Sequence, residues 1–523
     1  MVDKKSTDSA DMVSDVVVNK EIKYTPMDPV WCESTGDFTL PDYMPQIARM
    51  LSCTPRIVAS GKYIGSDRAE FTGSIVYSVI YTGEDGVPFY TTLTGDYEYS
   101  VPLLDAASSP KVEVYDEPVI ESVSVRASGP RRISARARIC SRPHVLHEDN
   151  VAAAVQCDAD AGFVKLRESV SKLEHCHFES GEFTVQDVFR LEASPDAEPV
   201  GCESTACITE VVMSGGVVRC RGEAECRIVY YDIIGGTRKL TSQKKKLRYE
   251  REIPVGFLGD VGGVRARPRV ISTQMSMDEG ESEMSVEVLL DISGEYTTES
   301  ETDIIRDIYN CDGECDVTYK NRVIRRSVLC KNMNLSCHGQ KELSAEYDTN
   351  DLVTLSSQVK VKDIKVQDAL AHISGEITVE CVLSHSNGDE TEYSSVNIPV
   401  PFRCEAPVNN TAKRYVSSVS ADVMGVRVRV EKDTIAADAE VYLSAFIGGE
   451  DEMRAVDEVF VSDVVLAKSN EITVYYPDKN ETLWSIAKKH RVPIDSLARD
   501  NSIAVSSPDS PASLDGVRSL VII

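Results

Sequence analysis

Two short segments carry the residue types that bind metal ions. His175, Cys176 and His177 are consecutive, and Cys337 directly precedes His338. Imidazole and thiolate groups are common ligands of zinc and related cations. On a strand, however, only alternate side chains share a face, so these residues would need matching ligands from elsewhere in the chain. No second set stands at metal-site spacing, and we therefore predict no metal and no cofactor.

The familiar catalytic motifs are also missing from the sequence. The stretch "SGKYIGSDR" from Ser60 lacks the glycine and hydroxyl residues of a phosphate loop, and neither G-x-S-x-G nor H-E-x-x-H occurs. The run Lys244 to Lys246 is typical of the wet face of a strand, with docking of an acidic partner as the alternative. We predict no catalytic residues and no enzymatic activity. An enzyme with an unrecognised site would show a cleft with perturbed titratable groups.

The C-terminal segment "NETLWSIAKKHRVPIDSLARDN", Asn480 to Asn501, has the pattern of two short helices. Thr482 can cap the first helix, and the second opens near Pro493. Strand candidates flank them at residues 471–476 and 519–523. The apolar stripes of the two helices are Leu483, Ile486 and Ala487, and Ile494, Leu497 and Ala498.

This β-α-α-β order, with its central Trp484, resembles a LysM module, a fold that grips N-acetylglucosamine polymers such as peptidoglycan and chitin. Sugar-binding LysM modules usually have Gly-Asp-Thr-Leu before the tryptophan, whereas this chain has Asn480-Glu481-Thr482-Leu483. The segment "AVSSPDSPAS" from Ala504 also remakes the other wall of the groove. We expect glycan binding to be weak or lost, and the module to bind a protein instead.

Four residues are candidates for this partner-binding role. Trp484 lies one step off the apolar stripe, where it can anchor an interface or pack as a core tryptophan. Ile472 is a second candidate, with burial in the core as its alternative. Lys488 and Lys489 offer charge to an acidic partner, or form a solvated helix face.

Composition narrows the classes of partner. The 523 residues include 56 Lys and Arg against 84 Asp and Glu, a formal charge of −28 that repels nucleic acid. No secretory signal and no apolar run long enough for a membrane helix are visible. The 15 cysteines form no C-x-x-C pair, which indicates reduced thiols. We expect a cytoplasmic protein without a transmembrane segment.

Three stretches share one layout and repeat after about 150 residues. They begin near Phe71, Cys220 and Ile373, and each contains an aligned glycine followed by a hairpin turn. Alternating apolar residues predict strands, and a second hairpin follows in each repeat. In the first repeat, "LPDYMPQIARMLSC" from Leu40 has helical spacing and predicts a short helix. The aligned glycines are Gly73, Gly222 and Gly375.

We therefore predict a mainly β fold, with three β-rich, sandwich-like repeat domains followed by a small β-α-α-β LysM domain. The expected boundaries are a flexible polar tail at 1–20, repeats at 21–165, 166–310 and 311–468, and the LysM domain at 470–523.

The segment "FTLPDYMPQIARMLS", the glycine-to-proline hairpins and the attached LysM resemble the SPOCS (DUF3794) domain family of clostridial sporulation proteins. The resemblance implies a morphogenetic adaptor at the forespore surface, in the mother-cell cytoplasm. Its LysM would bind the ATP-hydrolysing protein of the coat basement layer, and other coat proteins would be further partners. The alternative is a peptidoglycan-binding protein of the cell wall or spore cortex.

Overall fold

The computed structural model describes residues 18–103, 109, 112–116, 118–152, 162–234, 237–277, 283–343, 350–387, 390–408, 412–431, 433–465, 472–506, 508–510 and 514–523. The predicted polar tail lies outside these residues except for 18–20, which belong to the first strand. In this part of the chain nearly all regular structure is β, and the two helices lie near the C-terminus. No helix described here is long and apolar enough to span a membrane. The predicted mainly β class is confirmed.

Each repeat contains two packed antiparallel sheets. In the first repeat they are β3-β4-β5 and β2-β8-β7, and a third sheet, β1-β9-β6, extends beyond them. The predicted hairpins are present as β4 with β5 and as β7 with β8. The strands are β1 (Val18–Pro26), β2 (Val30–Thr39), β3 (Arg49–Ile64), β4 (Arg68–Thr82), β5 (Pro88–Pro102), β6 (Val112–Tyr115), β7 (Val119–Gly129), β8 (Arg132–Ser141) and β9 (His144–Ala152).

The second and third repeats follow the same plan with longer strands. The second pairs β12-β13-β14 in one sheet and joins β10, β11 and β15 to β16 in the other, and the third contains β18-β19-β20 and β17-β22-β21. The strands are β10 (Phe163–Glu179), β11 (Phe183–Arg190), β12 (Glu198–Ser214), β13 (Val217–Ile234), β14 (Thr237–Pro254), β15 (Gly263–Met277), β16 (Glu283–Asn310), β17 (Gly313–Glu342), β18 (Asn350–Gln367), β19 (Leu370–Asn387), β20 (Glu390–Pro407), β21 (Arg414–Glu431) and β22 (Thr434–Val465).

The aligned glycines occupy equivalent places, as predicted. Each lies in the central strand of its sheet, opposite an aromatic residue whose ring covers the space that a Cβ would fill. Opposite each glycine the preceding strand contains a β-bulge, so the glycine also admits a close backbone approach. The glycine and aromatic pairs are Gly73 with Tyr97, Gly222 with Tyr249, and Gly375 with Phe402.

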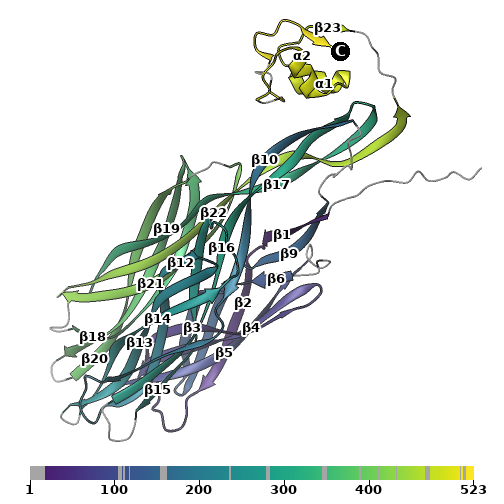
Figure 1. Cartoon of the computed structure of the whole chain (residues 1–523). Coiled ribbons are helices and arrows are strands. Elements are labelled where there is room, and N and C mark those ends of the chain that lie inside the picture. Colours follow the sequence, from purple (N-terminus) through teal and green to yellow (C-terminus); the bar gives the residue numbers. More distant parts are fainter. Residues whose placement is uncertain are drawn as a thin grey trace, which may run out of the picture.

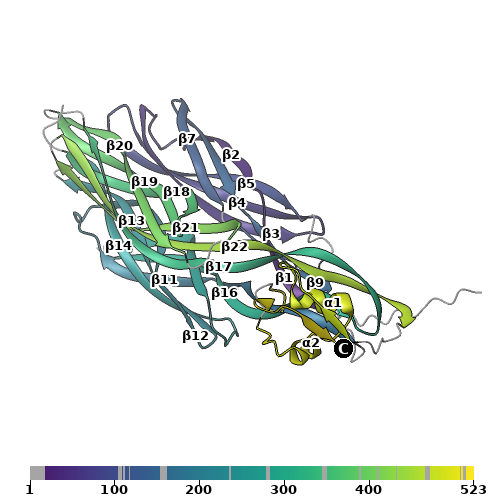
Figure 2. The same ribbon diagram turned by 90° about the horizontal axis from the view of Figure 1, so that it is seen from above.

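The sheets that contain these glycines, β3-β4-β5, β12-β13-β14 and β18-β19-β20, are called the inner sheets below. Their edge strands meet in a ring, because β5 contacts β12, β14 contacts β18, and β20 contacts β3. The inner sheets share an apolar cluster, to which each contributes a bulged residue: Leu51, Val200 and Val353. Figure 1 and the view from above in Figure 2 show one elongated β body with the C-terminal module at one end.

Five residues beyond each aligned glycine stand Ser78, Arg227 and Glu380, which line one small cavity together. The three repeats thus use equivalent positions for different polar side chains at their common junction.

The helix predicted for residues 40–53 is wrong. Residues 41–48 form turns and bends, and β3 begins at Arg49 and pairs with β4. Leu51 is the extra residue of a bulge between Met50 and Ser52. A bulge interrupts the two-residue alternation of a strand, so Ile47, Met50 and Leu51 imitate the spacing of a helix.

Candidate functional site

The C-terminal module contains both predicted helices. In α1 (Leu483–His490), Thr482 accepts a hydrogen bond from the Ser485 amide, and the Ser485 hydroxyl caps Thr482 in return. The second helix, α2 (Ile494–Asp500), ends at Asn501. The side chain of Asn501 bonds both the carbonyl and the amide of Val521, which ties α2 to the last strand. The predicted apolar stripes of both helices are buried.

A two-stranded sheet completes the module. In it β23 (Thr473–Tyr475) pairs with β24 (Leu520–Ile522). Leu520 and Ile522 are buried against the helices, but Ile472, Val474 and Tyr476 are 69%, 53% and 72% exposed. These three alternate residues form what we call the exposed β23 face. Burial of Ile472 in the core, one alternative from the sequence, is therefore wrong.

Trp484 is only 5% exposed and is packed within the chain. Its indole Nε1–H donates to Oδ2 of Asp307 at 2.8 Å, and its ring meets the edge of Tyr309 with centroids 5.0 Å apart. Asp307 and Tyr309 belong to β16, so this face of α1 is turned toward the second repeat.

Lys488 reaches the same carboxylate. Its Nζ lies 2.6 Å from Oδ1 of Asp307, which also accepts a hydrogen bond from Tyr319 on β17. Burial alone would raise the pKa of Asp307, but the hydrogen bonds from Lys488, Tyr319 and Trp484 lower it below its ordinary value. We call these five residues, Trp484, Lys488, Asp307, Tyr309 and Tyr319, the Asp307 contact.

Lys489 lies apart from the Asp307 contact. Its Nζ donates to the hydroxyl of Tyr475 at 2.9 Å and lies over that ring. The structure therefore brings Trp484 and Lys488 together and leaves Lys489 and Ile472 elsewhere on the module. Partner binding by any of the four stays a prediction.

The segment that corresponds to the sugar-binding loop of LysM modules forms hydrogen bonds with neighbouring parts of this chain. The Glu481 carboxylate accepts hydrogen bonds from the Tyr475 hydroxyl and the Asp478 amide. The amide of Trp484, in the first turn of α1, donates to the carbonyl of Pro508 in the segment after α2. These groups thus already form hydrogen bonds within the chain. A sugar that bound to the same groups would have to break those hydrogen bonds.

Comparison with known proteins identifies the C-terminal module alone. The LysM domain family matches residues 478–511, so the chain contains a LysM domain, a type of domain that supports peptidoglycan or glycan binding. No curated protein and no solved structure matches the chain.

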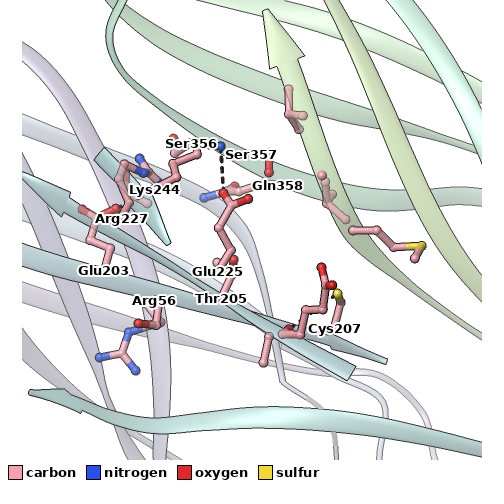
Figure 3. A pocket seen from close by; sticks show the side chains of 18 of the residues that line it. Arg56, Glu203, Thr205, Cys207, Glu225, Arg227, Lys244, Ser356, Ser357 and Gln358 are labelled. Carbon is pink, nitrogen blue, oxygen red and sulfur yellow. Dashed lines mark hydrogen bonds and ion pairs between the residues drawn. The ribbon is translucent and has the colours of Figure 1, made fainter. Parts of the chain in front are cut away.

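A second candidate site is a cavity of about 110 Å³ lined by all three repeats (Figure 3). Its charged residues pair with one another: Lys244 with Glu225 at 2.7 Å, and Lys246 with Glu223 at 2.8 Å. Lys245, the middle residue of the predicted basic run, pairs with Asp187. The basic run therefore has acidic partners within the chain.

One titratable group near this cavity is perturbed. Burial, together with the neighbouring charge of Glu203, raises the pKa of Glu380 to about 7, although hydrogen bonds from Ser395 and Ser356 oppose the change. The carboxyl adjoins the small cavity between the repeats, among Ser78, Arg227 and Glu203.

The histidines differ from the expectation drawn from the sequence. His338 pairs with Asp438 at an exposed position. His177, however, meets His144 and Glu295 from other strands. Residues of ligand type that are far apart in the sequence thus lie together, which no local spacing could reveal.

Proposed function

We propose that this chain is a non-enzymatic structural adaptor of spore-coat assembly. Its LysM domain would bind the ATP-hydrolysing protein of the coat basement layer and so tether the coat to the forespore from the mother-cell cytoplasm. The domain order, three β repeats followed by a LysM domain, resembles that of SipL, a clostridial spore-coat morphogenetic protein. The altered sugar loop favours a protein partner over a glycan.

The observation that carries the proposal is the exposed β23 face. Val474 lies in β23, Ile472 and Tyr476 directly flank that strand, and all three side chains are exposed. Apolar and aromatic side chains that gather on a surface are typical of the central part of a protein interface. We therefore place the partner on this face, since the indole N–H of Trp484 and the ammonium of Lys488 already have a partner in Asp307.

The test replaces Val474, the middle residue of the exposed β23 face, in the full-length chain. Val474→Asp should reduce capture of the basement-layer ATPase about thirtyfold, the effect of losing roughly 2 kcal/mol of interface energy. The side chain is exposed, so the variant should melt at the wild-type temperature. Val505→Asp is the matched control, because Val505 is an exposed apolar residue of the segment after α2. Full capture by the folded Val474→Asp variant would reject this face.

Peptidoglycan binding is the second candidate function, and the LysM match supports it. We expect the full-length chain to be retained weakly or not at all on purified peptidoglycan, because the loop contacts of Glu481 and Trp484 would have to break. Retention equal to that of a secreted LysM control would favour this function over the adaptor role.

A further inference from the structure

Two cross-strand pairs face each other where the first repeat meets the second. Tyr115 of β6 pairs with His144 of β9, and His177 of β10 pairs with Glu295 of β16. The Nε2 atoms of His144 and His177 are 3.2 Å apart, and Nε2 of His177 is 3.5 Å from Oε2 of Glu295. One potential ligand atom from each of His144, His177 and Glu295 lies within 4.8 Å of the other two.

Two of these distances match the spacing of ligand atoms around zinc. Bonds of about 2.0 to 2.1 Å to nitrogen or oxygen, arranged as a tetrahedron, separate neighbouring ligand atoms by roughly 3.3 to 3.4 Å. The distances of 3.2 Å and 3.5 Å lie on either side of this value. A cation bound by all three side chains would also require the separation of His144 and Glu295, which is within 4.8 Å, to approach this value.

The carboxylate is held in a suitable orientation. Glu295 is 3% exposed, and its Oε1 lies 2.5 Å from Nε of Arg265. Its Oε2, which faces His177, accepts no hydrogen bond from the residues that the structure describes. A buried acceptor without a donor costs free energy, and a cation would remove that cost.

The imidazoles are also prepared for ligation. The Tyr115 ring stacks on His177 and on His144, which fixes both ring planes.

We propose that His144, His177 and Glu295 bind a zinc ion that ties the first repeat to the second. Two imidazoles and one carboxylate are a recognised zinc ligand set, with a water as the fourth ligand. The positive charge of Arg265 opposes that of the cation, so we expect micromolar affinity. Bound zinc would stabilise the folded chain, because the ligands come together only when both repeats are folded.

The first experiment measures zinc binding to the full-length chain, stripped with a chelator and kept reduced with a phosphine. Calorimetry should show one equivalent of Zn²⁺ bound, and the melting temperature should rise with Zn²⁺ concentration. His144→Ala and Glu295→Gln should each weaken binding at least about tenfold. His338→Ala should bind like the wild type, because His338 pairs with Asp438 away from the cluster.

The second experiment separates this site from the cysteines. Co²⁺ in a site of nitrogen and oxygen ligands gives visible bands alone, whereas thiolate ligation adds an intense near-ultraviolet charge-transfer band. Visible bands without that charge-transfer band would support the proposal. The measurement uses the wild-type chain, so it does not depend on the folding of any variant. Failure of the wild type to bind Zn²⁺ at micromolar concentration, a thiolate spectrum, or undiminished binding by folded Glu295→Gln would overturn it.

Discussion

At the scale of single residues, the aligned glycines lie where an added side chain would collide with a neighbouring strand. A Cβ on Gly222 would lie 2.3 Å from the carbonyl oxygen of Cys207 and equally close to the Tyr249 ring. The ring can turn aside, but the strand backbone cannot move without loss of its ladder. A side chain at Gly222 therefore requires a shift of the strand backbone.

We predict that Gly222→Ala lowers the free energy of unfolding by about 3 kcal/mol, the upper part of the range for an overpacked core. Gly425→Ala is the matched control, because that strand glycine has nothing within 4 Å of the added Cβ. Urea titration should show a lower midpoint for the first variant and an unchanged or slightly higher one for the second. Equal midpoints would show that the inner sheet can adjust.

Glu380 makes the stability of the junction between the repeats depend on pH. In the folded chain the Glu380 carboxyl keeps its proton up to about pH 7, whereas in the unfolded chain a glutamate releases its proton near pH 4.3. The folded state binds more protons in this interval, so the contribution of Glu380 to stability falls as the pH rises from about 4 to 7. Above pH 7 the buried charge is a constant cost.

Glu380→Gln removes that charge. We expect the variant to melt at a higher temperature than the wild type at pH 8 and at nearly the same temperature at pH 4.5. Glu376→Gln, on the same strand but paired with Lys362 at the surface, should show no such difference between the two pH values. An identical shift at both pH values would mean that ionisation of Glu380 does not set the effect.

At the scale of elements, the Asp307 contact fixes the LysM domain against β16 and β17. The Asp307 carboxylate accepts hydrogen bonds from the indole of Trp484, the ammonium of Lys488 and the hydroxyl of Tyr319. Arg491 adds an ion pair to Glu314, and the Tyr309 hydroxyl donates to the carbonyl of Val492.

Asp307→Ala should loosen this contact and expose Trp484 to water. The chain has two tryptophans, so Trp31→Phe leaves Trp484 as the sole reporter. In that background we expect Asp307→Ala to shift the fluorescence maximum to longer wavelength. Asp303→Ala, which removes only an exposed pairing with Arg167, should leave it unchanged. An unchanged spectrum in both variants would show that apolar packing alone holds the domain.

Much of the fold was predictable from local pattern. The capping residue Thr482, the helical stripes and the equivalent glycines were all found, because turn, cap and strand signals are local. The start of β3 was predicted wrongly as a short helix at residues 40–53, since a bulge produces the same spacing.

The candidate sites were harder to predict than the fold. Trp484 and Ile472 could be named, but their exposure depends on Asp307 and on the free face of a two-stranded sheet. His144, His177 and Glu295 come from three strands, and only the folded chain brings them together.

At the scale of the whole molecule, the shared apolar cluster should make the three repeats unfold together. Val229 is 1% exposed in that cluster. We predict that Val229→Asp lowers the melting temperature of all three repeats in one calorimetric transition. Val188→Asp, at an exposed position of β11, is the control and should have little effect. Separate transitions for the repeats would show that each is stabilised by its own core alone.

The ring of inner sheets brings three different side chains to one junction between the repeats. Ser78, Arg227 and Glu380 occupy equivalent positions around one junction, and the charge of Arg227 is felt by Glu380. Three separate but identical subunits would have to place three copies of one of these residues there, and three arginines or three glutamates so close together repel strongly away from water. Joining the copies in a single polypeptide frees each to carry a different residue, so covalent linkage permits an asymmetric centre that a symmetric trimer could not hold.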